Sequence, residues 1–303
     1  MIPAAWYAPL PSFLWQVALH SAVAGVVLYG WARRLRLRSG RSKRHLLALL
    51  LVLPLLTAAI PGRTSLEFRE RRAWLDSGRL LAIPLVAGVR VSHVVLLVGL
   101  TMVALTLWQE VLPALRRSGA RGDNAPEPLA RLARGLPGWA RCAVTLSRAD
   151  ALLLATGGWP WRPRVIVSRG ALARLSDDEL AMALRHEHAH WQQGRWARSH
   201  ALFAVRLLQC YSPVALWTFR EYCLEVEIEC DAAAVAGRDA RPLTRALLAV
   251  YESTDRRDVA ARAALRRRAD VLLGDDRLDD DALPVATIAA AAATLVAILP
   301  WLV

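Results

Sequence analysis

The sequence contains almost no lysine. Lys43 is the only lysine among 39 basic residues, so arginine supplies nearly all of the positive charge. A formal net charge of +13 would suit a protein that binds nucleic acid. Because the excess of positive charge comes from one residue type, we interpret it as a bias in composition rather than as a phosphate-binding patch. We therefore expect no direct binding to nucleic acid.

Cysteine is also scarce, and no two cysteines have the spacing of a metal-binding pair (Cys142, Cys210, Cys223 and Cys230). All four lie in the segment that is assigned to the cytoplasm below, where the reducing environment disfavours disulfides. We expect buried free thiols.

Apolar residues make up 55% of the chain and gather in four long runs. These runs cover residues 13–31, 46–60, 91–112 and 284–303, and the second is the shortest and contains Pro54. A helix needs roughly 20 apolar residues to cross a bilayer. Basic residues follow the first run rather than precede it, which indicates an uncleaved anchor and not a signal peptide. The sequence predicts an α-helical membrane protein with about four transmembrane helices, three of them within residues 1–115.

A dense basic cluster lies between the first two runs, at residues 33–44. Short loops that are rich in Lys and Arg stay in the cytoplasm. This rule places the N-terminus outside, residues 33–45 inside, residues 62–90 outside and residues 116–283 inside. Because the 62–90 loop also contains arginines, the predicted topology depends on the density of the first cluster.

Residues 116–283 are numerous enough for one cytoplasmic domain. We interpret 116–137, which is rich in Arg, Gly and Pro, as a tether. Strand-like runs at 142–146, 151–156 and 165–168 predict a small sheet of two or three strands. Ser176 and Glu179 form a capping box for a helix that should end near Gly194, and further helices are expected at 196–210, 213–237, 243–258 and 260–273. The domain is therefore predicted to be α+β.

The segment from His186 to His190 contains a His-Glu-x-x-His motif. Residues four apart share a helix face, so His186 and His190 can both bind one metal ion. Glu187 lies beside them, where it can activate a water molecule and pass its proton to a leaving amine. His188 points away from the other two histidines and is not expected to be a ligand.

Zinc hydrolases usually use three protein ligands, so one more is needed. On the helix predicted at 213–237, Glu227 and Asp231 lie among apolar positions and should face inward. Glu227 is the predicted third ligand. Asp231 is predicted to hydrogen-bond the outer nitrogen of a ligand histidine, and His186 is the histidine that we expect it to contact. Three further acidic residues lie four apart on a different side of this helix, and we interpret this stripe as a solvated face (Glu221, Glu225 and Glu229).

Residues 201–218 are apolar except for Arg206 and resemble a further membrane span. A span there would put the histidines and Glu227 on opposite sides of the bilayer. We therefore expect this stretch to be buried within the domain or to rest on the membrane surface.

The chain resembles the BlaR/MecR-type antirepressor metallopeptidases, which are bacterial membrane gluzincins. The resemblance covers most of the chain, and a few segments carry it (residues 161–168, 175–180, 186–190, 212–213 and 227–231). It implies a zincin-like domain in which Zn²⁺ is bound by His186, His190 and Glu227. It also implies that Glu187 is the catalytic base and that Asp231 supports a ligand. Related CAAX-protease and HtpX-like peptidases tend to have Ala before that Asp, where this chain has Cys230.

Two departures from the family pattern limit what the resemblance implies. The basic-acidic pair that often follows the second histidine is replaced by residues 193–196, Gln-Gly-Arg-Trp. The chain also ends with its fourth apolar run, where antibiotic-sensing members continue into an outer β-lactam-binding domain.

The resulting expectation is a zinc endopeptidase of the bacterial inner membrane that cleaves a cytoplasmic protein substrate, such as a transcriptional repressor, in a signalling circuit. Two alternatives stay open. One is a membrane scaffold or signal transducer with a structural or inactive metal site. The presence of Glu187 favours catalysis over this alternative, because a structural site would not need it. The other is HtpX-like quality control of membrane proteins.

Overall fold

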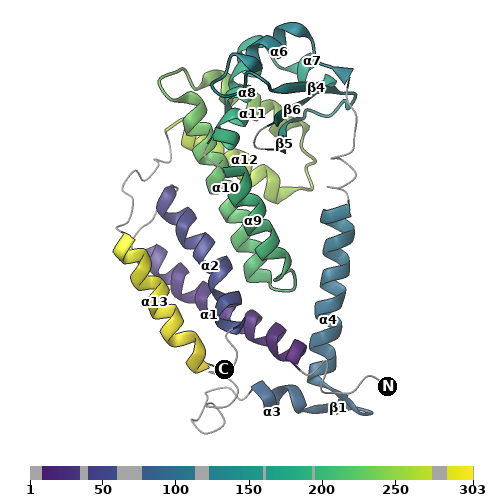
Figure 1. Ribbon diagram of the computed structural model, residues 1–303, viewed down its shortest axis with the longest axis vertical. Coiled ribbons are helices and arrows are strands. Elements are labelled where there is room, and N and C mark those ends of the chain that lie inside the picture. Colours follow the sequence, from purple (N-terminus) through teal and green to yellow (C-terminus); the bar gives the residue numbers. More distant parts are fainter. Residues whose placement is uncertain are drawn as a thin grey trace.

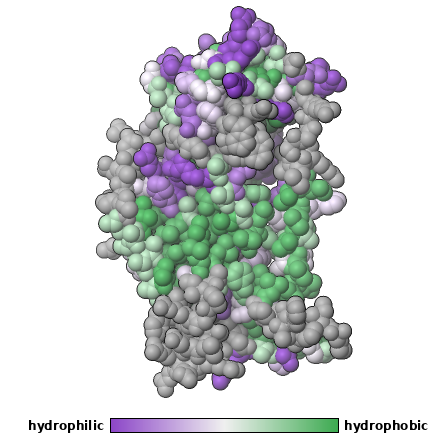
Figure 2. Space-filling model, in the orientation of Figure 1, coloured by the Kyte–Doolittle hydropathy of each residue, from purple (hydrophilic) through white to green (hydrophobic). Residues whose placement is uncertain are grey.

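The computed structural model describes residues 9–34, 40–59, 77–112, 123–159, 162–192, 195–274 and 285–302. Its elements form two layers along the long axis of the molecule (Figure 1). One layer consists of long apolar helices, and the other combines a small sheet with shorter helices. On the visible face, a hydrophobic belt crosses the first layer, whereas polar residues dominate the far end of the second (Figure 2).

Each of the four predicted apolar runs forms a helix. These are α1 (Pro9–Arg34), α2 (Arg41–Ala59), α4 (Val91–Thr106), which continues as a short π-helix (Leu107–Val111), and α13 (Val285–Leu302). Among the described residues, two segments are long and apolar enough to cross a membrane, Leu10–Trp31 and Val91–Val111. The apolar part of α13 is shorter, and α2 begins with basic residues. A four-span arrangement therefore stays a prediction.

The apolar helices pack by leucine and alanine contacts. α1, α2 and α13 share one buried cluster, which includes Leu28, Leu50 and Leu295. His20 Nδ1 lies 2.9 Å from Thr57 Oγ1, so these polar residues join α1 to α2 as helix–helix contacts do inside membranes. α4 stands to one side and leaves most of its leucines exposed (Figure 1). Helix α3 (Ser77–Ala82) and the hairpin of β1 (Pro84–Val86) and β2 (Val89–Arg90) lie at the end away from the sheet.

The sheet has four strands in the order β3-β4-β6-β5. These are β3 (Asp123–Asn124), β4 (Ala143–Ser147), β6 (Arg162–Ser168) and β5 (Leu154–Trp159). β6 is parallel to β4 and antiparallel to β5, which is an edge strand. The prediction of a tether at 116–137 is wrong for its described part, because β3 joins the sheet and α6 (Glu127–Arg134) packs on the core through Leu129 and Ala133. A two-residue strand and a proline-started helix are too short to show a periodic pattern.

The predicted helices are present with small shifts at their ends. They are α8 (Asp177–Gln192), α9 (Arg195–Leu207), α10 (Pro213–Val235), α11 (Arg241–Ser253) and α12 (Val259–Leu272), preceded by the short α7 (Arg169–Arg174). The capping box is confirmed, since Glu179 accepts from the Ser176 amide at 3.0 Å and Ser176 Oγ accepts from the Glu179 amide at 3.4 Å. Gly237 has φ 69° just after α10, the left-handed conformation that ends a helix.

The acidic stripe on α10 is not a solvated face, so that prediction is wrong. Glu225 is fully buried, its Oε1 lies 2.7 Å from Lys43 Nζ, and its Oε2 accepts from the Gly40 amide at 2.9 Å. Glu221 also pairs with Lys43, at 3.2 Å, and Glu229 pairs with Arg44. The basic start of α2 thus covers the stripe. The start of α2 thus contacts α10, a helix of the layer that contains the sheet.

We expect the Lys43–Glu225 pair to couple the two layers energetically. Breaking one side of a buried pair leaves the other charge poorly compensated. Glu225→Ala should therefore cost less stability in a Lys43→Ala background than alone, by about 0.5–3 kcal/mol. Thermal unfolding of the four proteins in detergent measures this coupling, with the exposed Glu252→Ala as a control. Additive losses would contradict it.

Candidate metal centre

Helix α8 positions the two histidines. They lie four residues apart, and their Nε2 atoms are 3.1 Å from each other. The capping box fixes the start of this helix, and Leu180 and Leu184 anchor it in the core beneath the sheet. His186 is buried and His190 is partly exposed, so both imidazoles line one side of a cavity.

Glu227 of α10 completes a compact set of possible metal ligands. Its Oε2 lies 3.2 Å from His186 Nε2, and its Oε1 lies 3.2 Å from His190 Nε2. Tetrahedral zinc with bonds of about 2.0–2.1 Å holds its ligand atoms about 3.3 Å apart. The three sides of this triangle are close to that separation, and the three residues are a group that could hold a metal ion. Two imidazoles and a carboxylate are also the donor types that a hydrolytic metal site uses.

Asp231 lies behind His186, on the side away from the cavity. Its Oδ1 is 2.7 Å from His186 Nδ1, and the carboxylate is buried. A carboxylate at this nitrogen favours the tautomer that keeps Nε2 available for a metal and also fixes the orientation of the ring. The structure therefore brings Asp231 next to the histidine to which sequence reasoning assigned it.

Arg268 of α12 is part of the site and was missed from the sequence. Its Nε and Nη2 donate to Asp231 at 2.7 and 2.8 Å, and its Nη1 lies 2.9 Å from Glu227 Oε2. Burial opposes its charge, but the two carboxylates outweigh this effect and raise the pKa of Arg268. The residue stands in a run of three arginines, Arg266 to Arg268, and no motif distinguishes it from its neighbours.

The electrostatics of the site favour charged side chains despite burial. Burial disfavours the imidazolium of His186, but Asp231 and Glu227 outweigh it and raise its pKa to about 10. Burial also opposes protonation of His190, yet contacts with Cys230 and Glu227 raise its pKa to about 11. The pKa of Glu227 is held well below its usual value, because the histidines and Arg268 overcome its burial. A metal ion must therefore displace protons from these imidazoles, which couples its binding to pH.

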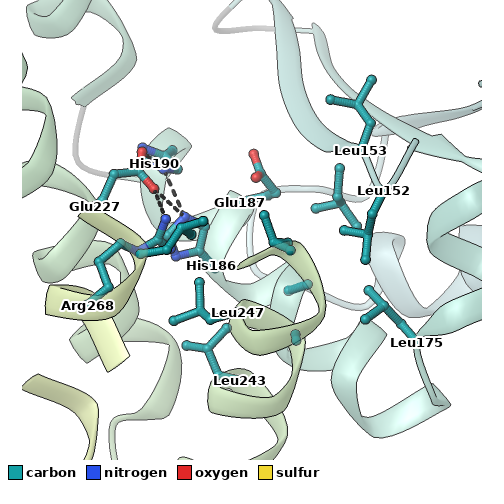
Figure 3. A pocket seen from close by; sticks show the side chains of 15 residues that line it. Leu152, Leu153, Leu175, His186, Glu187, His190, Glu227, Leu243, Leu247 and Arg268 are labelled. Carbon is teal, nitrogen blue, oxygen red and sulfur yellow. Dashed lines mark hydrogen bonds and ion pairs between the residues drawn. The ribbon is translucent and has the colours of Figure 1, made fainter. Parts of the chain in front are cut away.

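Glu187 faces the same cavity from the next position on α8 (Figure 3). Its Oε2 accepts hydrogen bonds from the Thr156 amide at 2.7 Å and from Thr156 Oγ1 at 2.6 Å. Thr156 belongs to the edge strand β5, so the outer edge of the sheet is turned toward the cavity. Sequence reasoning missed Thr156, because only the tertiary fold brings β5 against α8.

The cavity has a volume of about 350 Å³ and combines these polar groups with an apolar wall. Figure 3 shows the histidines and Glu227 on one side, Leu152, Leu153 and Leu175 on the other, and Glu187 between them. Leucines of α11 close the wall, among them Leu243 and Leu247. The arrangement can accept an apolar side chain next to a group that is bound at the histidines.

His188 lies outside the ligand cluster, as its helical angle predicted. Its Nε2 is 2.7 Å from the Pro137 carbonyl oxygen, and its ring packs against Trp139 and Trp191. The four cysteines are free thiols, as expected, but only Cys142 and Cys230 are buried, whereas Cys210 and Cys223 are partly exposed.

Residues 155–270 match the family model that is described as BlaR1 peptidase M56. The match runs from β5 to α12 and includes the three candidate ligands together with Glu187, Asp231, Arg268 and Thr156. A comparison with curated proteins gives no match. Together with the two helices that are long and apolar enough to cross a membrane, the family match indicates a membrane metallopeptidase.

We expect each of the three clustered side chains to be required for metal retention. His186→Ala, His190→Ala and Glu227→Ala each remove one ligand from a three-ligand site, so the bound metal should fall from close to one ion per chain to a small fraction. Elemental mass spectrometry of the purified protein measures this content. The exposed His200→Ala is the matched control and should keep its metal. Wild-type metal content in all three variants would exclude this cluster as the metal site.

Arg268→Ala should weaken metal binding without removing a ligand. Asp231 and Glu227 would lose the cation that orients them, and changes to such supporting contacts cost about 10- to 100-fold in metal affinity. Competition with a chelator measures the affinity. Arg266→Ala, an exposed arginine on the same helix, provides the comparison. Equal affinities in the two variants would show that Arg268 does not support the site.

Proposed function

We propose that the protein is a zinc-dependent endopeptidase of the membrane, since residues 155–270 match the family model that is described as BlaR1 peptidase M56. One observation carries this proposal. His186, His190 and Glu227 converge on one point of a cavity that Glu187 also faces. A site that only stabilises the fold would have no use for a further carboxylate beside its ligands.

The ligand set favours zinc. Two histidines and one glutamate leave a coordination position free, which is the pattern of catalytic rather than structural zinc sites. When bound, zinc would supply a Lewis acid that polarises the scissile carbonyl and makes a water molecule more acidic. His186 and His190 would bind through Nε2, and Asp231 would hold His186 through Nδ1.

Glu187 would act as the general base and then as the general acid. Its carboxylate would take a proton from the attacking water, whose oxygen forms the new bond to the carbonyl carbon. The carbon–nitrogen bond then breaks, and Glu187 would deliver the proton to the amine nitrogen. The two hydrogen bonds from Thr156 would hold the carboxylate in the cavity between these transfers.

The edge strand β5 would align the substrate. The amide of Thr156 points out of the sheet toward the cavity, and backbone groups two residues away on a strand point to the same edge. Leu154 and Gly158 can therefore pair with an extended peptide as an added strand. The leucine wall of the cavity favours an apolar side chain close to the scissile bond.

The substrate would be a cytoplasmic regulatory protein such as a transcriptional repressor, with the peptidase domain facing the cytoplasm of a bacterial cell. Support comes from the family and from the basic start of α2, which contacts α10 of this domain. Such basic segments stay in the cytoplasm.

Glu187→Ala tests the proposal, because it removes the base and keeps all three metal ligands. Cells that express the wild type should contain new protein N-termini that are absent with this variant, whose metal content should be unchanged. Mass spectrometry of N-terminal peptides identifies them, and Glu252→Ala on α11 is the control. Identical product profiles with metal still bound would exclude a peptidase and favour a scaffold. Products drawn mainly from membrane proteins would indicate quality control instead.

A further inference from the structure

The hairpin of α9 and α10 extends from the peptidase domain into the layer of apolar helices (Figure 1). Its turn, residues 208–212, contacts two of them through Gln209. The Gln209 side-chain amide donates to the Leu51 carbonyl oxygen at 2.7 Å, and Ser21 Oγ donates to Gln209 Oε1 at 3.3 Å. Ser21 lies near the middle of the apolar segment Leu10–Trp31, and Leu51 lies near the middle of α2. The turn therefore reaches the central level of these helices.

The length of α10 between Glu221 and the turn indicates how deeply the turn lies in the layer of apolar helices. Glu221 pairs with Lys43 at the basic start of α2, so this part of α10 lies at the charged edge of the apolar layer. From Glu221 down to Ser212, the α-helical rise spans about 14 Å along the axis. Half of a bilayer's hydrocarbon thickness is about 15 Å. A hairpin of this length that enters at the charged edge ends close to the middle of the bilayer.

The surface of the hairpin suits a hydrocarbon environment. Leu208 at the turn is 63% exposed, and Trp217 on α10 is 46% exposed. The hydrophobic belt of Figure 2 runs over this level of the molecule. Arg206 is the one charged residue of the stretch 201–218. It is buried in an ion pair with Glu110 of the π-helix that follows α4, where Nη2 and Oε1 are 2.7 Å apart. Pairing reduces the cost of placing this charge at an apolar level.

We propose that the α9–α10 hairpin is a re-entrant element. It enters the leaflet on the peptidase side, turns at residues 208–212 near the middle of the bilayer and returns to the same side. The occupant of its exposed apolar face is lipid hydrocarbon. The Gln209 side-chain nitrogen donates to the Leu51 carbonyl of α2, and its oxygen lies 3.3 Å from Ser21 Oγ of α1, so the turn presents no unpaired Gln209 amide to lipid.

This arrangement places the metal centre at the membrane surface. Glu227 follows Glu221 on α10 by about 9 Å of helical rise. The cavity would therefore lie just above the charged edge of the apolar layer. If the proposed peptidase function holds, peptide bonds close to the membrane are the ones within its reach. The re-entrant hairpin itself does not depend on that function.

Spin-label accessibility in lipid vesicles tests the proposal with three similarly exposed leucines. Leu208 marks the turn, Leu100 at 56% exposure marks the middle of α4, and Leu248 at 53% exposure marks α11 in the peptidase domain. Each is replaced by cysteine in the full chain, labelled and reconstituted in phosphatidylcholine and phosphatidylglycerol. The half-buried thiols Cys210 and Cys223 are first replaced by alanine. Collisions with oxygen report hydrocarbon, and collisions with a water-soluble nickel complex report water.

The label on Leu208→Cys should show the high oxygen and low nickel accessibility of Leu100→Cys, with an oxygen-to-nickel ratio several-fold above that of Leu248→Cys. A ratio like that of Leu248→Cys, or one typical of the headgroup level, would overturn the proposal. Metal content of the labelled protein confirms that the domain is folded. The same measurement on Glu187→Ala should give the same depth, so that loss of peptidase activity and loss of the re-entrant hairpin are distinguished.

Discussion

A buried carboxylate needs partners, and Asp231 finds them on two other helices. It lies against Nδ1 of His186 on α8 and accepts two hydrogen bonds from Arg268 on α12. Without these contacts, burial of its charge would be strongly unfavourable. The triple contact therefore holds α8, α10 and α12 in one arrangement. Glu227 is one helical turn away on α10, so the same contact brings its carboxylate to the two imidazoles.

Helix α10 carries acidic residues on two faces, and each face has a different consequence. The face with Glu227 and Asp231 forms the metal centre, whereas the face with Glu225 binds Lys43 and the Gly40 amide at the start of α2. Both sets of acidic residues lie on one continuous helix, Pro213–Val235. Its first turns also form half of the hairpin that reaches Leu51. One element thus connects the layer of apolar helices with the candidate catalytic site.

Helical periodicity placed the candidate ligands on the sides of α8 and α10 that meet in the structure. The spacing of His186 and His190, and the apolar neighbours of Glu227, each place a side chain relative to its own helix. Helical periodicity does not predict which other segment of the chain packs against a given face of a helix. The stripe with Glu225 was for this reason interpreted as solvated, although a segment far away in the chain buries it. Arg268 was missed for the same reason, since its role depends on where α12 packs.

What the sequence by itself determined is local: the apolar helices, the capped helix with its two histidines, and the inward side of α10. These follow from interactions between residues a few positions apart, where spacing and helix geometry leave little choice. Only the tertiary structure decided that Arg268 supports the carboxylates, that Thr156 holds Glu187, and that residues 201–218 form a hairpin among the apolar helices. These outcomes depend on contacts between distant segments, which form because buried polar groups must find partners wherever the packed helices bring them.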